Sequence, residues 1–220
     1  MQTNILKTLA AILLSVLITG CCNQNSGTEK NDQQTATEAA VNQNETVILD
    51  DSLKRTLIEK GTEVAGRTTS ALQKALKGAI QEGGLEYAIK FCNLEALEIT
   101  DSISEMETVA IKRVAEKHRN PLNKMDEAEN ELFTSYISQL QNEQPLHPVI
   151  IANNEGHPVF YQPIYTGALC LNCHGKLDTN ISPALAGTIQ KLYPDDQATG
   201  FKEGQLRGMW AITFTEMKVN

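Results

Sequence analysis

The sequence predicts an α+β domain in which long helices come first and short antiparallel strands follow. Two stretches with helical spacing of apolar residues lie between residues 50 and 100, and two apolar runs flank an Asn-Asn-Glu-Gly turn at 153–156. A third apolar run, GMWAITF, occupies residues 208–214. Helices followed by strands of this kind pack as helices against one sheet.

The first predicted helix spans residues 50–82, where leucine, valine and isoleucine recur at spacings of about three, four and seven residues. Gly83 and Gly84 end this helix, and a second helix begins after them. One face of the second helix carries five apolar or small residues: Leu85, Ala88, Ile89, Cys92 and Ala96.

The remaining elements are shorter. Residues 108–114 are rich in β-branched residues and predict a strand, and Asn120-Pro121 predicts a loop because proline disfavours helical geometry before it. A helix is expected over residues 126–140. Residues 148–152 and 158–165 predict a hairpin, and residues 208–214 a closing strand. Ser182 is expected to cap a short helix that ends at Leu192.

The first twenty residues have the pattern of a lipoprotein signal peptide. Lys7 precedes an apolar run over residues 9–18, which is too short to span a bilayer. The run ends in LITGCC, so cleavage before Cys21 would free its thiol for lipidation. The alternative is an ordinary secretory signal with a chance cysteine. We expect a lipid anchor on Cys21 that holds the protein on a bacterial membrane, on the extracytoplasmic side.

Residues 21–47 predict a disordered tether, because residues 22–46 carry no aromatic and almost no large apolar side chain. Residues 48–220 are expected to form a single domain. The formal net charge is −8, and an acidic chain repels phosphate backbones, so nucleic acid is not an expected partner.

The segment ALCLNCHGK at 168–176 carries the most specific motif, Cys170-x-x-Cys173-His174. A structural zinc site needs four ligands, and no second Cys-x-x-Cys pair or His-x₃₋₅-His pair is present. A thioredoxin-like dithiol would need a βαβ context, which the preceding residues suggest only weakly.

The third interpretation is covalent haem attachment, for which Cys-x-x-Cys-His is the recognised pattern. Cys170 and Cys173 would form thioethers with one haem, and His174 would ligate its iron. Haem c is attached outside the cytoplasm, so the signal peptide and the motif are independent observations that agree.

Several separated motifs resemble a known family. FYQPIYTGALCLNCHG, EKHRNPLNKMDEAENELF and YPDDQATGFKEGQLRGMWAITF are similar to a haem c-containing family of sensor-type domains long labelled a domain of unknown function. Its members are stand-alone bacterial and cyanobacterial haem c proteins and input domains of sensor kinases. The resemblance covers roughly residues 50–217 and implies a PAS-like fold, with a curved antiparallel sheet and long N-terminal helices.

The resemblance also bears on the second iron ligand. From the pattern alone, Cys92 is a small buried residue on an apolar helical face, as free cysteine often is. The family implies a helical cysteine thiolate opposite the histidine, and Cys92 falls at that position. Four alternatives remain open: Met106, Met125, Met209 and His118. A thiolate would favour ferric iron and a low potential, whereas methionine raises the potential.

Three arginines are candidates for the haem propionates: Arg67, Arg119 and Arg207. Each could equally be a surface or fold-stabilising residue. Arg119 is the strongest candidate, because its loop belongs to the family match.

The sequence therefore predicts a membrane-tethered mono-haem c protein for redox or small-gas sensing or for low-potential electron transfer. The extracytoplasmic partner would be a redox or signalling protein. A His/Met electron-transfer cytochrome is the alternative, and a peroxidase-like enzyme is less favoured because no distal acid–base pair is evident.

Overall fold

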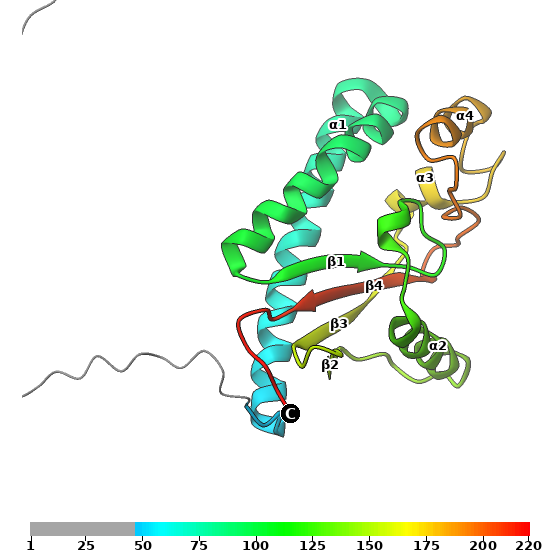
Figure 1. Cartoon of the computed structure of the whole chain (residues 1–220). Helices are drawn as coiled ribbons and strands as arrows, with labels where there is room; N and C mark the ends of the chain where they lie inside the picture. The colour runs from blue at the N-terminus through cyan, green and yellow to red at the C-terminus, as the bar shows by residue number, and fades with distance from the viewer. Residues whose placement is uncertain (1–46) are drawn as a thin grey trace, which may run out of the picture. The chain divides into compact units, whose positions relative to one another are not determined.

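A computed structural model describes residues 47–220 (Figure 1). The expected signal peptide, Cys21 and the tether up to residue 46 lie outside the described residues. In residues 47–220, no helix combines the length and the apolar character needed to cross a membrane.

The longest element, α1 (Asp51–Glu107), consists of two helical arms that meet at a break. Gly83 and Gly84 leave helical geometry there, and the φ of Gly84 is +72°. Glycine adopts this left-handed value readily because it has no Cβ. In Figure 1 the chain rises along the first arm, reverses at the glycines and returns along the second. The prediction of two helices separated by Gly83 and Gly84 is confirmed.

Four strands form one antiparallel sheet in the order β1-β4-β3-β2. They are β1 (Ala110–Val114), β2 (Val149–Ala152), β3 (Pro158–Tyr165) and β4 (Leu206–Thr213). All four strands expected from the sequence are present, and β4 begins two residues earlier than expected. The predicted α+β class, with an antiparallel sheet and long N-terminal helices, is confirmed.

The two central strands are buried on both faces, and alternate residues serve opposite layers. Phe160 and Ile212 belong to the core beneath α1, whereas Val159 and Met209 belong to the core beneath α2 (Glu127–Gln141). The first arm of α1 approaches the sheet closely at Gly61, where a Cβ would lie only 2.3 Å from the ring of Phe160.

An ion-pair cluster joins the end of the second arm to the middle of the first arm. Glu107, the last residue of α1, accepts a hydrogen bond from Lys60 Nζ at 2.6 Å and a second bond from Arg67. Arg67 also pairs with Glu63 at 2.7 Å. The two arms are therefore connected covalently at the glycine break and electrostatically where the second arm ends.

The remaining helices are short: η1 (Pro121–Asn123), η2 (Ala168–Cys170), α3 (Leu171–His174) and α4 (Pro183–Leu192). Ser182 caps α4 as predicted, since its hydroxyl accepts a hydrogen bond from the Leu185 amide at 3.2 Å. Leu185 and Ile189 of α4 pack against Ile89 in the second arm of α1. This contact places the Cys-x-x-Cys-His segment beside the upper part of α1 (Figure 1).

Candidate cofactor-binding cavity

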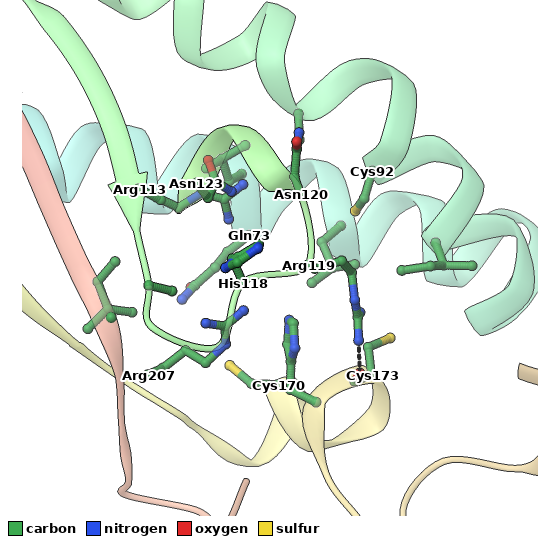
Figure 2. Close-up of a pocket in the computed structure, with 18 of the residues that line it drawn as sticks. Gln73, Cys92, Arg113, His118, Arg119, Asn120, Asn123, Cys170, Cys173 and Arg207 are labelled. Carbon is green, nitrogen blue, oxygen red and sulfur yellow. Dashed lines mark hydrogen bonds between the residues drawn. The ribbon is translucent and has the colours of Figure 1, made fainter. Parts of the chain in front are cut away.

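A cavity of about 300 Å³ lies between the two arms of α1 and the ends of strands β1, β3 and β4 (Figure 2). Its volume is at the lower end of the range for small-molecule and cofactor sites, about 300–1,000 Å³. Most of the lining surface is apolar, and α1 contributes to it Leu72, Leu76, Ile80, Leu85 and Ile89. The opposite wall carries the charged side chains, which are those of Arg113, Arg119 and Arg207.

Cys170, Cys173 and His174, the three motif residues, all line this cavity. The motif forms η2 and α3, a compact turn of helix that directs three closely spaced residues to one side. Both cysteines are free thiols and half-buried, and burial raises the pKa of Cys173. Two unpaired thiols and an imidazole are therefore available to a ligand in the cavity.

His174 is fixed in one orientation by the backbone. Its Nδ1 lies 2.7 Å from the carbonyl oxygen of Ala198, so Nδ1 carries the proton and Nε2 keeps its lone pair. Burial, together with the positive charges of Arg119 and Arg207, holds the pKa of this imidazole well below its usual range. A neutral imidazole with one nitrogen held by a carbonyl is the usual state of a metal-ligating histidine.

Arg119 lines the cavity, but its charge is already paired. It donates to both carboxylate oxygens of Asp196, at 3.1 and 3.0 Å, and to the carbonyl of Cys173 at 2.7 Å. The Arg119 side chain is 9% exposed and the Asp196 side chain is 5% exposed. Arg119 therefore links the motif to the segment around Asp196, and this geometry favours a fold-stabilising role over a propionate contact.

Cys92 projects from the second arm of α1 into the cavity, above Cys170 and Cys173 in Figure 2. Burial raises the pKa of its thiol, while the positive charges of Arg113 and Arg119 act in the opposite direction. Those two guanidiniums would stabilise a thiolate once a ligand displaced the thiol proton.

The structure reduces the number of residues that could replace Cys92 as the ligand opposite His174. His118 lines the cavity, with its Nδ1 3.3 Å from the carbonyl of Glu116. Met125 and Met209 are buried in the core beneath α2, on the other face of the sheet, and Met106 is 68% exposed. Of the five residues considered as the ligand opposite His174, only Cys92 and His118 therefore reach the cavity.

The other two arginine candidates for a propionate contact, Arg67 and Arg207, differ in their position relative to the cavity. Arg67 takes part in the ion-pair cluster with Glu107 and does not line the cavity, whereas Arg207 does line it. Arg113, which was not among the residues predicted from the sequence, lies on β1 opposite Trp210 and lines the cavity. Its signal was the alternation along β1, which puts this charged residue on the same face as Ile111.

Within the described part of the chain, no three histidine, cysteine, aspartate or glutamate side chains gather closely enough to hold a metal ion between them. These residues therefore offer no ligand set for a structural zinc ion. The candidate ligands are instead spread around a cavity with apolar walls, which suits a larger apolar cofactor.

Comparisons with known proteins agree with this architecture. The family described as Tll0287-like matches residues 30–215. The crystal structure of the cyanobacterial haem protein Tll0287 superposes with a TM-score of 0.50, covers 72% of this chain and 98% of that chain, and is 23% identical in sequence. At this identity the likeness concerns the fold. No curated protein matches the chain.

Proposed function

The chain belongs to the Tll0287-like family, and from this membership we propose that it binds haem, attached as haem c through Cys170 and Cys173. One observation carries the proposal: both motif cysteines and His174 line the same cavity as Cys92. The solved family structure is described as a haem protein, and it supports the same assignment.

The residues present fit this cofactor. Two unpaired thiols at the motif spacing could form the thioethers, and the apolar wall supplied by α1 could cover a planar macrocycle. The bond from His174 Nδ1 to the Ala198 carbonyl leaves Nε2 free to ligate iron. The haem would supply an iron that exchanges one electron between its ferric and ferrous states.

We further propose that Cys92 is the second axial ligand. Its thiol shares the cavity with His174, and the guanidiniums of Arg113 and Arg119 lower the cost of a thiolate there. A thiolate donor stabilises the ferric state, so a low-potential haem follows.

A redox or small-gas sensor is the role that the site supports best. Cys92 lies on the second arm of α1, which begins at Gly83 and Gly84, where the backbone is not helical. Release of the Cys92 thiol would free an axial position and free this arm to shift. Electron transfer is the second candidate, because Cys170 and Cys173 are only half-buried and the cavity edge is therefore near the surface.

The proposed location is the extracytoplasmic face of a bacterial membrane, with a lipid on Cys21. The support comes from the LITGC pattern after a short apolar run and from the export that haem c attachment requires. Cys21→Ser should move the protein from the membrane fraction to the soluble fraction and leave the haem content unchanged. A variant that stays in the membrane fraction would reject the anchor.

The deciding experiment for the cofactor combines mass and spectrum. Protein made with a haem-attachment system should exceed the polypeptide mass by one haem, resist acid–acetone extraction and give distinct oxidised and reduced spectra. Cys170→Ala with Cys173→Ala is the matched control and should lose covalent attachment. A colourless wild-type protein that binds zinc would refute the proposal.

A further inference from the structure

The cavity carries an excess of positive charge. Arg113, Arg119 and Arg207 line it, whereas no aspartate or glutamate within residues 47–220 does so. Burial first, and then the charges of Arg119 and Arg113, lower the pKa of Arg207 to about 10. Like charges repel more strongly in a site from which water is partly excluded. A bound anion would relieve this repulsion.

The excess does not arise from Arg119. Its two hydrogen bonds to Asp196 form a planar pair in which one guanidinium faces one carboxylate, and its Nη2 also reaches the Cys173 carbonyl. Its guanidinium also lies over the ring of Tyr193, 5.8 Å from the centroid. The charge of Arg119 is thus paired within the protein, although its Nη1 makes no hydrogen bond in the described residues.

Arg207 is only partly satisfied. Its Nη1 donates to the Lys117 carbonyl at 2.9 Å, and its guanidinium lies over the ring of Phe201, 5.0 Å from the centroid. Its Nε is buried and has no hydrogen-bond partner in the described residues. A buried N–H without an acceptor is costly and uncommon in folded proteins, so this atom points to an acceptor that the protein itself does not supply.

The Arg113 side chain has no hydrogen-bond or ion-pair partner in the part of the chain that the structure describes. Its guanidinium lies over the ring of Trp210, 5.8 Å from the centroid, which fixes its direction. Desolvation by the surrounding protein lowers the pKa of Arg113, although the residue is exposed and lines the cavity. Arg113 is therefore a second cation that is oriented by the fold and lacks a counter-charge.

We propose that Arg113 and Arg207 together bind the carboxylates of the cavity's ligand, and that Arg119 is not part of this site. The inference rests on the proposed haem function, because haem carries two propionates. A guanidinium offers two parallel N–H groups that match the two oxygens of a carboxylate. One propionate on each arginine would neutralise both charges and give Arg207 Nε its missing acceptor.

The test compares two probes that differ only in the carboxylates, hemin and hemin dimethyl ester. The full chain carrying Cys170→Ala and Cys173→Ala keeps binding reversible and serves as the reference protein. It should bind hemin about tenfold more tightly than the diester, or more, as expected for charge-assisted hydrogen bonds. Arg113→Gln and Arg207→Gln should each reduce this preference, and the double variant should remove most of it.

Two kinds of control keep the result interpretable. Arg67→Gln removes an arginine that is paired outside the cavity and should leave the preference unchanged. Arg113→Lys and Arg207→Lys keep the charge, fold more safely and should retain part of the preference. Circular dichroism and thermal melting identify any variant that fails to fold. If a glutamine variant fails to fold, the hemin preference of the corresponding lysine variant is compared with that of the reference protein instead.

The outcomes separate the inference from the function on which it rests. Equal affinity of the reference protein for hemin and its diester would overturn the carboxylate site while leaving haem binding intact. A preference that survives the loss of Arg113 and Arg207 but disappears in a folded Arg119→Gln variant would overturn the choice of arginines. Failure of the reference protein to bind either probe would overturn the carboxylate site, and only a wild-type protein without covalent haem would overturn the proposed function itself.

Discussion

Asp196 holds Arg119 with both oxygens of its carboxylate, at 3.1 and 3.0 Å, in a pair that is almost fully buried. Asp196 Oδ1, which accepts from Arg119 Nε, also accepts a hydrogen bond from the Ala198 amide at 2.9 Å. The carbonyl of Ala198 is in turn the hydrogen-bond partner of His174 Nδ1. One carboxylate therefore anchors Arg119 and positions the peptide that orients the histidine. The proposed iron ligand depends on a residue that it does not contact.

Asp196→Asn should destabilise the protein strongly. The amide keeps the shape but removes the charge, and an uncompensated buried guanidinium costs about 3–5 kcal/mol. Urea unfolding of the chain without cofactor measures the change. Glu63→Gln is the matched control: it breaks an exposed ion pair with Arg67, whose expected contribution is about 1 kcal/mol or less. Similar losses in both variants would contradict this account of Asp196.

Cys92→Met should raise the midpoint potential of the haem-loaded protein, because a neutral thioether replaces an anionic donor. Potentiometric titration measures the shift, and each 59 mV corresponds to about tenfold in the one-electron equilibrium constant. Cys92→Ala should leave a ferric haem that takes up cyanide or imidazole readily, whereas the wild type should resist both ligands.

His118→Ala is the comparison for Cys92, because His118 is the other candidate that reaches the cavity. It should leave the ferric spectrum and the midpoint potential close to those of the wild type. If Cys92→Ala instead leaves both unchanged and His118→Ala alters them, the axial ligand is His118 and Cys92 only fills space.

Glu107 should make stability depend on pH in the acid range. A hydrogen bond from Lys60, aided by the charges of Lys60 and Arg67, lowers the pKa of this 7%-exposed carboxyl from its ordinary value of 4.5. A lowered folded-state pKa contributes stability that is complete above about pH 4.5 and is lost as the pH falls through the folded value. Glu107→Gln should therefore be less stable than wild type at pH 7.

The stability difference between wild type and Glu107→Gln should shrink as the pH falls below about 4.5. Urea midpoints at several pH values measure this difference. Glu105→Gln, an exposed position two residues earlier in the same helix, should give a small difference with little pH dependence. A Glu107 difference that stays constant from pH 7 to pH 3 would refute the electrostatic role of the cluster.

Replacing two glycines of the first arm of α1 by alanine should change the free energy of unfolding in opposite directions. A Cβ on Gly61 would lie 2.3 Å from the ring of Phe160, so Gly61→Ala should cost about 1–3 kcal/mol through overpacking. Gly66 has no atom within 4 Å of a built Cβ, and Gly66→Ala should stabilise the helix by about 0.5–1 kcal/mol. Denaturant unfolding of both variants tests the packing of α1 on the sheet, and stabilisation by both would contradict it.

The sequence predicted those parts of the fold that short-range chemistry determines. The break at Gly83 and Gly84 follows from the conformational freedom of glycine, and the start of α4 follows from the hydroxyl of Ser182. The hairpin between β2 and β3 follows from alternating apolar runs around a polar turn. Each signal lies within a few residues of the element that it specifies.

Which arginines are paired and which face the cavity could not be predicted from the sequence, because the pairing depends on partners far along the chain. Arg119 pairs with Asp196, 77 residues later, and Arg67 pairs with Glu107, 40 residues later. The cavity-facing position of Arg113 also depends on the pairing of β1 with β4. Residue type predicted that arginines would matter at the site, and only the tertiary structure distinguishes paired guanidiniums from available ones.

The two walls of the cavity also differ in when they can form. The wall made by α1 consists of two helical arms whose backbone hydrogen bonds are local, and helices of this kind form quickly. The wall that carries Cys170 and Cys173 depends on strands such as β1 and β4, where Ala110 pairs with Thr213 across about half the chain. Long-range pairing of this kind is slow because a large loop must close first. If the helical hairpin forms first, the thiols of Cys170 and Cys173 stay accessible to modifying enzymes while the strands pair.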